Sequence, residues 1–275
     1  MTNRFGSNNH SASNQIRAGY RNAIGAASNN RQAPLATSVA WREQKFIKPV
    51  PFNGLLTNKL LSALPGDAFT RLLPYLEPVA LAAEENICEP GETAQFNYFP
   101  ENAVISHYYA MSNGSTTEAA LIGREGMTGL SAIFNARPPA FWTHVTLAGN
   151  ALRIRTDVLR EEFDLGGSLQ SLLLAYASAR LAQATQRVVC NGQHTMPQRL
   201  CSWLLMLHDR IGDDHLSLTH EQIARHLGTR RAGISEIATA LRHRGDISYS
   251  RGLIHILNRQ GLESAACECY KMLIQ

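Results

Sequence analysis

Two short helical patterns joined at a glycine, within residues 218–241, constrain this chain more than any other feature. Thr219 and Gln222 have the spacing of a capping box, in which each side chain bonds the other residue's backbone N–H, so a helix is predicted to begin at His220. One face of this helix carries Ile223, Ala224 and Leu227. Gly228 follows where helices often end in a left-handed residue, so the first helix is predicted to be short and sharply stopped.

A second helix is predicted to follow almost at once, with Thr229 as its N-cap. Its apolar stripe consists of Ile234, Ile237, Ala238 and Leu241. Two short helices that turn their apolar faces inward across a tight turn form a helix-turn-helix. The outward face of the second helix carries Arg230, Arg231, Ser235, Glu236, Thr239 and Arg242. Arginines near the start of such a helix suit the major groove of DNA, where a guanidinium can bridge guanine O6 and N7.

A β-hairpin is predicted directly after these helices, with strands at 247–250 and 253–257 and a turn at Arg251 and Gly252. This hairpin has the position of a wing, and Arg251 would lie at its tip near a phosphate. The predicted DNA-contacting residues are Thr229, Arg230, Arg231, Ser235, Glu236, Thr239 and Arg251. Any amphipathic helix pair with surface arginines can look similar, but the cap, the glycine, the arginines and the hairpin all favour DNA binding.

Residues 218–256 resemble the winged helix-turn-helix of the Crp/Fnr family of bacterial transcription regulators. The runs GTRRAGISEIATAL and RGLIHILNRQGLESAACECY are similar to one poorly characterised branch of that family. The resemblance implies an α+β fold with an N-terminal β-roll (a jelly-roll-like effector domain), a long dimerisation helix and a C-terminal winged helix-turn-helix. It also implies a homodimer that binds double-stranded DNA and contacts RNA polymerase.

One departure from the family pattern concerns base reading. In family members that respond to cyclic AMP, the recognition helix uses an Arg-Glu pair and a later Arg. Arg231 matches the first Arg, but Ala232 replaces the Glu and Glu236 replaces the later Arg. The operator sequence is therefore not implied by the resemblance.

Composition sets the outer bounds of the fold and the compartment. The 275 residues are 44% hydrophobic and 17% charged, enough for one large or two ordinary domains. A net charge of +4 is compatible with a polyanionic partner without establishing one. No apolar run approaches the roughly 20 residues that cross a bilayer. Five cysteines without a secretory signal indicate reduced thiols, so we expect a soluble cytoplasmic protein with no membrane partner.

Catalytic motifs are absent from the sequence. It contains no G-x-S-x-G, no H-E-x-x-H, no P-loop and no dinucleotide-binding fingerprint in a strand-helix setting. We therefore expect that the protein is not an enzyme.

Residues 1–50 are predicted to be a disordered basic tail. Large apolar residues are few there, and no acidic residue precedes Glu43. Residues 1–40 contain Arg4, Arg17, Arg21 and Arg31. Such a segment cannot bury enough surface to offset the ordering of the chain. An organellar transit peptide and loose contact with DNA phosphates are alternatives, although the bacterial character of the C-terminal half argues against the first.

Residues 51–165 are predicted to form an all-β effector-type domain after short helices at 58–76. Short β-like runs lie at 79–81, 87–88, 98–99, 104–109, 118–122, 143–147 and 151–154. Turns are predicted between them at Pro90-Gly91, Asn113-Gly114, Pro138-Pro139 and Gly149-Asn150. Many short strands separated by turns indicate a sandwich or barrel. By resemblance, this is the cyclic-nucleotide-binding β-roll of the family.

A candidate ligand pocket is predicted in this domain, formed by Gly123, Arg124, Glu125, Gly126, Met127, Thr128 and Thr143. In relatives that bind cyclic nucleotides, a Gly-Glu segment is followed about ten residues later by Arg-Ser or Arg-Thr, which neutralises the phosphate. Glu125 is a counterpart of the first part, but no Arg precedes Thr143. We do not expect cyclic AMP in the usual geometry, unless Arg124 or Arg137 substitutes. A different small ligand and a degenerate pocket both stay open.

Residues 166–192 are predicted to form a dimerisation helix and hinge, and 193–275 the DNA-binding domain. The expected dimer interface consists of Leu169, Leu172, Leu173, Tyr176 and Gln183. Packing within one chain is the alternative. A helix break is predicted at Asn191 and Gly192, and Pro197 suits the first turn of the next helix, which spans 199–207.

Metal chemistry is not predicted. The oxygen-sensing branch of the family holds an iron-sulfur cluster on N-terminal cysteines, but the first cysteine here is Cys88, so no such cluster is expected. Cys267 and Cys269 supply only two of the four ligands of a structural zinc site, and they are predicted to lie in an ordinary terminal helix. His107 and His144 each stand alone in a β-like run, so they are expected to be ordinary core or surface histidines. The alternative to a DNA-binding regulator is a sensor or protein-interaction module that uses the β-roll and this thiol pair.

Overall fold

The computed structural model describes residues 56–112 and 115–273. The predicted basic tail and the predicted turn at Asn113 and Gly114 lie outside this range. The described part begins with short helices, as predicted: α2 (Lys59–Ser62), α3 (Gly66–Leu72) and the 3-10 helix η1 (Leu73–Tyr75). Asn58 caps α2 by accepting a hydrogen bond from the backbone N–H of Leu61 at 3.0 Å, which satisfies a donor that a helix start leaves free.

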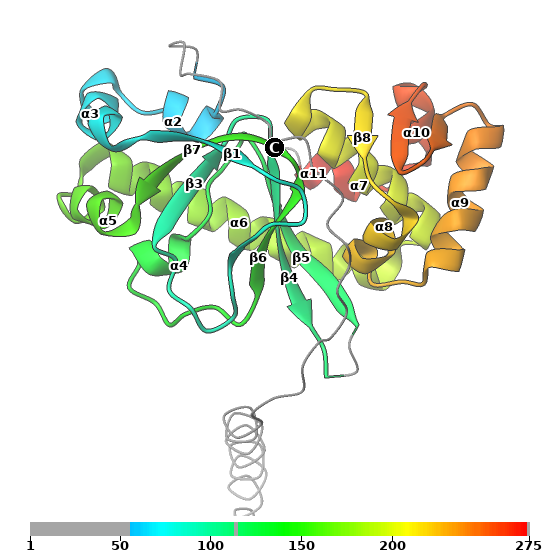
Figure 1. Cartoon of the computed structure of the whole chain (residues 1–275), viewed down its shortest axis with the longest axis horizontal. Coiled ribbons are helices and arrows are strands. Elements are labelled where there is room, and N and C mark those ends of the chain that lie inside the picture. The colour runs from blue at the N-terminus through cyan, green and yellow to red at the C-terminus, as the bar shows by residue number, and fades with distance from the viewer. Residues whose placement is uncertain (1–55, 113–114, 274–275) are drawn as a thin grey trace, which may run out of the picture. The chain divides into compact units, whose positions relative to one another are not determined.

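Two antiparallel sheets follow in the described chain (Figure 1). Their strands are β1 (Glu77–Leu81), β2 (Asn86–Cys88), β3 (Phe96–Pro100), β4 (Val104–Ala110), β5 (Thr116–Ile122), β6 (Trp142–Leu147) and β7 (Gly149–Arg155). The strand orders are β1-β7-β3 and β2-β6-β4-β5. Each predicted β-like run lies inside one of these strands, so the predicted all-β domain is confirmed.

Apolar side chains fill the space between the strands. One cluster of buried residues consists of Leu81, Ala103, Ile105, Ile122, Val145 and Ala151. These residues come from strands far apart in sequence, so their burial fixes the register in which the strands pair. A short helix, α4 (Leu130–Ile133), lies between β5 and β6 in sequence.

Three helices lead from the sheets to the C-terminal half: α5 (Thr156–Asp164), α6 (Gly167–Gln193) and α7 (Met196–Ile211). The predicted break at Asn191 and Gly192 is wrong, because α6 continues through both residues. One glycine costs a helix only about 1 kcal/mol. The chain breaks at His194 and Thr195 instead, where Thr195 forms a capping box and Pro197 lies in the first turn of α7. We call these two residues the hinge.

The C-terminal half is a winged helix-turn-helix. Its elements are β8 (His215–Ser217), α8 (His220–Leu227), α9 (Arg231–His243), β9 (Ile247–Ser250), β10 (Leu253–Ile256), α10 (Arg259–Ala265) and α11 (Cys269–Leu273). The predicted capping box is present, with the backbone N–H groups of Thr219 and Gln222 bonded at 2.7 and 3.2 Å. Strand β8 joins the predicted hairpin in the sheet β8-β10-β9, which the sequence does not predict.

The turn between α8 and α9 differs from the prediction at its second residue. Gly228 has the expected left-handed conformation, with φ of 66°. The backbone N–H of Thr229, however, donates to the carbonyl of Ala224 at 2.9 Å and so completes the end of α8. The N-cap of α9 is therefore Arg230 and not Thr229.

One hydrophobic cluster joins the β-sheets to the helix-turn-helix. Val104, Leu121 and Leu147 come from β4, β5 and β6 and pack in the same cluster as Trp203 on α7. Helix α8 also packs on β5. The two halves of the described chain therefore share buried apolar surface that neither would cover alone.

Glu118 on β5 is a fully buried carboxylate at this junction. Its Oε1 accepts hydrogen bonds from Arg187 on α6 at 2.7 Å and from Trp203 on α7 at 3.2 Å. Its Oε2 accepts from Ser106 at 2.8 Å and lies 3.1 Å from Nδ1 of His226 on α8. Burial alone would raise the pKa of Glu118, but Arg187, His226 and Ser106 outweigh it and hold the pKa at about 2.

We expect Glu118→Ala to destabilise the protein by about 3–5 kcal/mol, because it leaves the half-buried Arg187 and the buried His226 without their carboxylate partner. The contribution of Glu118 should be complete above pH of about 4.5 and be lost as the pH falls through about 2, since the folded-state pKa is lowered. Urea denaturation at several pH values measures both effects. Glu77→Ala, which removes an exposed ion pair with Arg153, is the control and should change stability by less than about 1 kcal/mol. Equal losses in the two variants would contradict the role of Glu118.

Candidate functional site

The exposed face of α9 carries most of the residues predicted to contact DNA. Arg230, Arg231, Glu236 and Thr239 are exposed, while Thr229 and Ser235 are half-buried. Ser235 is turned partly toward α8, where its hydroxyl lies 2.9 Å from Nδ1 of His220. The opposite face of α9 buries Ile234, Ala238 and Leu241. The helix is therefore held by its apolar face, and its polar face is open to solvent.

Arg230 and Arg231 are placed where a helix gains nothing from positive charge. They stand at the N-terminus of α9, whose first turn has no acidic residue, and the helix dipole there favours anions. Within residues 56–112 and 115–273, neither guanidinium forms an ion pair. Both guanidinium groups are therefore available to an external anion at the N-terminus of α9.

The turn before α9 depends on contact with the β-domain. A Cβ atom on Gly228 would lie 2.7 Å from Oγ1 of Thr117 on β5, too close for any other residue without a shift. Arg225 and Gln222 on α8 also contact Glu84 in the β-domain, at 3.0 and 2.9 Å. The β-domain therefore holds α8, and α8 in turn sets the direction of α9.

The wing tip is formed by Arg251 and Gly252, which both have positive φ, 49° and 81°. Arg251 is exposed, as predicted for a residue at the tip. Left-handed φ is uncommon for a residue with a side chain and costs about 1–2 kcal/mol. Glycine would adopt this backbone conformation at lower cost than arginine, but it would not place a positive charge at the wing tip.

A cavity of about 280 Å³ lies among β2 to β6, α4 and α6. Its lining includes the apolar residues Ile87, Phe96, Ile122, Met127, Leu130, Phe141 and Leu181. His107 also lines it, stacked on Phe141 with ring centroids 4.1 Å apart. Burial, together with Arg180, lowers the pKa of His107 to about 3, so this imidazole is neutral at ordinary pH. The cavity is thus mostly apolar with a neutral ring on one wall.

Only part of the predicted ligand pocket lines this cavity. Met127, Thr128 and Thr143 do; Gly123, Arg124, Glu125 and Gly126 do not. The Glu125 carboxylate pairs with Arg210 on α7 at 2.8 Å, and the Arg124 guanidinium donates to the carbonyl of Asp209 at 2.6 Å. This segment therefore helps to hold α7 in place.

Arg180 on α6 is a cation at the cavity wall that the sequence reasoning missed. Its Nη1 donates to the carbonyl of Leu121 and to Oε1 of Gln183, both at 2.8 Å. Arg180 follows Tyr176 by one helical turn on the buried side of α6, and a charge on the apolar face of an amphipathic helix is a signal that could have identified it.

The residues predicted for the dimer interface face their own chain. Leu169, Leu173 and Tyr176 are buried in the cluster that α6 forms with α2, α3 and α5, and Leu172 packs against that cluster. Gln183 donates to the carbonyl of Leu273 at 3.3 Å. The exposed large apolar residues of α6 are others: Leu174 (52% exposed), Leu181 (70%), Val188 (72%) and Val189 (48%). Leu169, Leu173 and Tyr176 are therefore covered by their own chain, and the exposed apolar residues lie on another side of α6.

Comparisons with known proteins bear on both halves of the chain. Residues 198–265 match the family model of the Crp-like helix-turn-helix domain. No curated protein sequence matches the chain. No helix in the described residues is long and apolar enough to span a membrane.

Several solved structures share the fold. FixK2 from Bradyrhizobium japonicum is 17% identical, with a TM-score of 0.60 over 70% of this chain and 98% of that one. A Crp/Fnr-family transcriptional regulator from Thermus thermophilus is 20% identical, with a TM-score of 0.56 over 69% and 98%. The c-di-GMP-responsive global regulator CLP of Xanthomonas campestris is 14% identical, with a TM-score of 0.53 over 70% and 99%. The predicted architecture of β-roll, long helix and C-terminal helix-turn-helix is confirmed.

Replacing Arg251 by glycine separates the backbone of the wing from its charge. We expect Arg251→Gly to leave stability unchanged or raise it by up to about 1 kcal/mol, because glycine adopts the left-handed turn without strain. The same variant should bind all duplex sequences more weakly and lower the salt slope by about one unit, as expected for one lost phosphate contact. Thermal unfolding and fluorescence anisotropy at several salt concentrations measure these effects. A change in base preference would contradict the placement of Arg251 at a phosphate.

Proposed function

We propose that this chain, a Crp/Fnr-type transcription regulator with a Crp-like helix-turn-helix domain, binds operator DNA as a homodimer through the exposed faces of its two α9 helices and its two wings. The observation that carries the proposal is the pair Arg230 and Arg231, exposed and without an ion pair in the described chain, at the end of α9 where a helix favours anions.

The residues of α9 would divide their work by position. Arg230 and Arg231 would contact guanine edges and phosphates, since guanidinium donors fit both. Thr229, Ser235 and Thr239 are short polar residues that suit phosphates or base edges, and Arg251 would bind a phosphate from the wing. Glu236 is the acidic member of this face and suits an amino group such as cytosine N4.

A second copy of the chain would pack on the exposed side of α6. Leu174, Leu181 and Val188 recur at every seventh position, which places them on one stripe of the helix. A stripe of this kind is complementary to the same stripe on an identical helix, because a two-fold axis brings equivalent residues together. Two α9 helices related by that axis could then read successive major grooves of a two-fold site.

The apolar cavity is the proposed effector site. It suits a small ligand with an apolar body, and Arg180 at its wall would favour an anionic group. Arg180 and Leu181 are adjacent on α6, so a ligand could act on the helix that pairs the two copies. It would do so only by binding one arrangement of the dimer better than another. Cyclic AMP in the usual geometry is not favoured, because Glu125 is already paired with Arg210.

The cellular setting belongs to the same proposal. Five reduced cysteines fit a cytoplasmic regulator, and a DNA-bound dimer would act through RNA polymerase, as the family resemblance implies. No iron-sulfur cluster and no catalytic activity form part of it.

Arg230→Ala combined with Arg231→Ala should weaken binding to a duplex selected by the wild-type protein on the order of 100-fold, because two guanidinium contacts are lost. Selection from genomic fragments followed by anisotropy titration measures the change. The matched control, Arg137→Ala combined with Arg155→Ala, removes the same charge from exposed positions of the β-domain and should retain most of the affinity. Equal affinity of both double variants would contradict the assignment of α9. Failure of the wild-type protein to bind any duplex would instead favour a sensor or interaction module.

Leu174→Glu combined with Val188→Glu should convert the dimer to a monomer, because four charges would meet at the two-fold stripe. Light scattering after size exclusion measures the mass. The control is Leu73→Glu combined with Leu165→Glu, at exposed apolar residues outside the stripe. This variant should have the same mass in solution as the wild-type protein. A wild-type protein that is monomeric at every concentration would contradict the proposed interface.

A further inference from the structure

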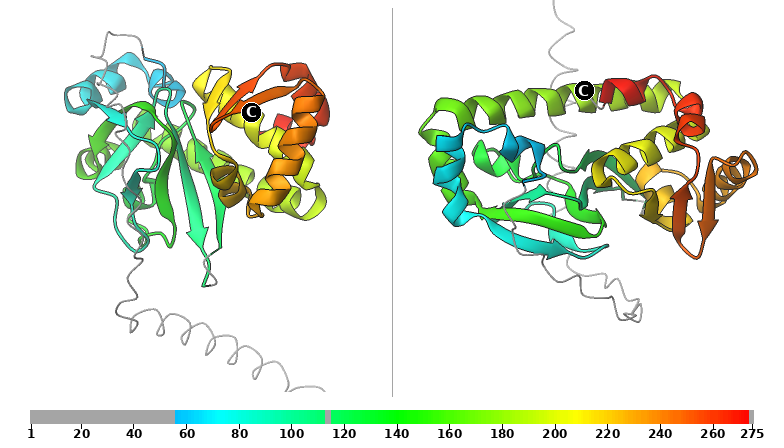
Figure 2. Two further views of the ribbon diagram at one scale, coloured as in Figure 1. Left: turned by 45° about the vertical axis from the view of Figure 1, so that its right-hand side comes forward. Right: turned by 90° about the horizontal axis from the view of Figure 1, so that it is seen from above.

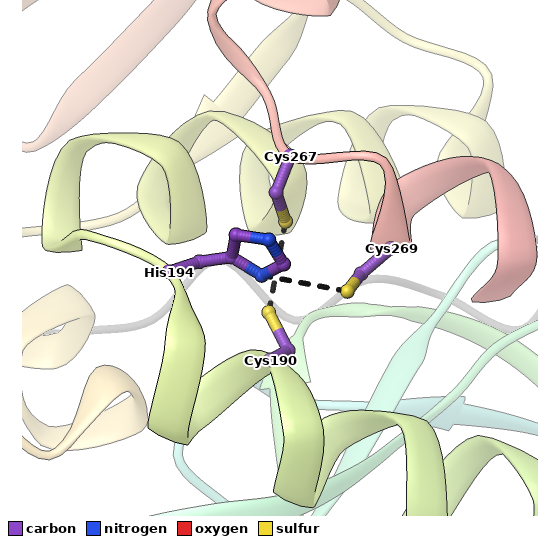
Figure 3. A group of neighbouring side chains, drawn as sticks. All are labelled: Cys190, His194, Cys267 and Cys269. Atoms are coloured by element: carbon purple, nitrogen blue, oxygen red, sulfur yellow. Dashed lines mark hydrogen bonds between the residues drawn. The ribbon is translucent and has the colours of Figure 1, made fainter.

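Three cysteines and one histidine converge between the end of α6 and the start of α11 (Figure 3). Cys190 lies in the last turn of α6, and His194 is the hinge residue that follows the helix. Cys267 lies between α10 and α11, and Cys269 begins α11. One donor atom from each of these residues lies within 4.8 Å of all the others. From the sequence, Cys267 and Cys269 offer only two thiolates; the fold adds Cys190 and His194.

The spacing within the cluster fits tetrahedral coordination of zinc. Zn–S bonds of about 2.3 Å and Zn–N bonds of about 2.0–2.1 Å place two sulfur ligands about 3.8 Å apart and a sulfur and a nitrogen about 3.6 Å apart. Sγ of Cys190 lies 3.6 Å from Sγ of Cys267, and Sγ of Cys269 lies 3.5 Å from Nδ1 of His194. These distances leave the centre of the cluster as the place where a small cation would sit.

Neighbouring groups orient the four side chains. Nε2 of His194 lies 3.2 Å from the carboxylate of Glu268, which turns the other ring nitrogen, Nδ1, toward the sulfurs. A carboxylate behind a histidine ligand fixes its tautomer and orientation in many metal sites. Gln186 donates to Sγ of Cys269 at 3.0 Å, and the hydroxyl of Ser202 lies 3.2 Å from Sγ of Cys267. The amide of Gln186 is a donor that stabilises the thiolate of Cys269 rather than the thiol.

We propose that Cys190, His194, Cys267 and Cys269 bind one Zn²⁺ ion in a structural site. Three thiolates and one imidazole form a Cys₃His set, which supplies all four ligands of tetrahedral zinc and leaves no open position. Three of the four residues are buried and His194 is half-buried, so exchange with solvent is restricted. Soft sulfur donors favour zinc over magnesium or calcium.

The ligands enclose the DNA-binding half of the chain. Cys190 and Cys267 are 77 residues apart in sequence, and the segment between them contains α7, the helix-turn-helix and the wing. Figure 2 shows α11 beside the C-terminal part of α6, and these two helices are in contact. The ion would thus tie the end of the winged domain to the hinge from which it starts. A cross-link over so long a segment removes much freedom from the unfolded chain.

A disulfide between Cys190 and Cys267 is the competing use of the same residues. Their sulfurs are close enough for oxidation, but a disulfide would need neither Cys269 nor His194. The pairing of His194 with Glu268 favours metal, because it presents a nitrogen lone pair to the sulfurs.

The test uses the full chain, purified under reducing conditions with a tag that does not bind metal. Inductively coupled plasma mass spectrometry should give about one zinc ion per chain. Replacement of zinc by Co²⁺ should produce the strong visible absorption of tetrahedral cobalt and a thiolate-to-cobalt charge-transfer band. Both measurements are made on the wild-type protein and so do not depend on a variant that folds. A wild-type protein without bound zinc and with the weak spectrum of octahedral cobalt, or with a Cys190–Cys267 disulfide as purified, would overturn the proposal.

Variants then identify the ligands. Cys269→Ser and His194→Ala should each lose the tetrahedral cobalt spectrum and bind zinc at least tenfold more weakly. Cys88→Ser changes a buried thiol of the β-domain and is the matched control, which should keep wild-type stoichiometry and spectrum. Loss of the spectrum in Cys88→Ser as well, or its retention in both ligand variants, would overturn the assignment. The readout is metal binding, so it is independent of whether the protein binds DNA.

Discussion

The buried carboxylate of Glu118 determines how the two halves of the described chain fit together. It belongs to β5, yet its partners come from β4, α6, α7 and α8, so one anion is shared by the sheet, the long helix and the DNA-binding domain. A buried charge must be paired in this way or it strongly destabilises the fold. The partners can satisfy it only in one arrangement, because Arg187 and His226 reach it from different helices. The packing of Val104, Leu121 and Leu147 against the helix-turn-helix cluster then follows from that arrangement.

The same junction bears on regulation. The β-domain holds α8 through Thr117 and Glu84, while α9 keeps its arginine-bearing face exposed. Helix α9, which would read bases, is thus exposed, and helix α8, which sets the direction of α9, is held by the β-domain. A ligand in the cavity would adjoin α6 and would lie on the same domain as these contacts. Under the proposed function, packed side chains would connect binding in the cavity to the direction of α9, which is the kind of connection that a shift between two dimer arrangements requires.

Local signals predicted much of the fold. The capping box at Thr219, the left-handed Gly228 and the turn at Arg251 depend on neighbours within a few residues, and each appears where the sequence places it. The failures involve partners far away in sequence. Glu125 is taken by Arg210, and Leu169 and Leu173 face their own β-domain, because tertiary packing decides which side of a segment is covered. The four-residue cluster of cysteines and histidine could not be predicted from the sequence, because its members come from two segments that only the contact of α11 with α6 brings together.

The apolar cluster that runs from β4, β5 and β6 into α7 has a consequence for how the molecule can be divided. The boundary between the β-domain and the winged helix-turn-helix passes through an apolar cluster to which both contribute side chains. The fully buried Trp203 lies in this cluster with Val104 and Leu121. A fragment that began at the hinge would expose that surface to water and would tend to associate. The β-domain and the winged helix-turn-helix are therefore better regarded as one folding unit than as two independent parts.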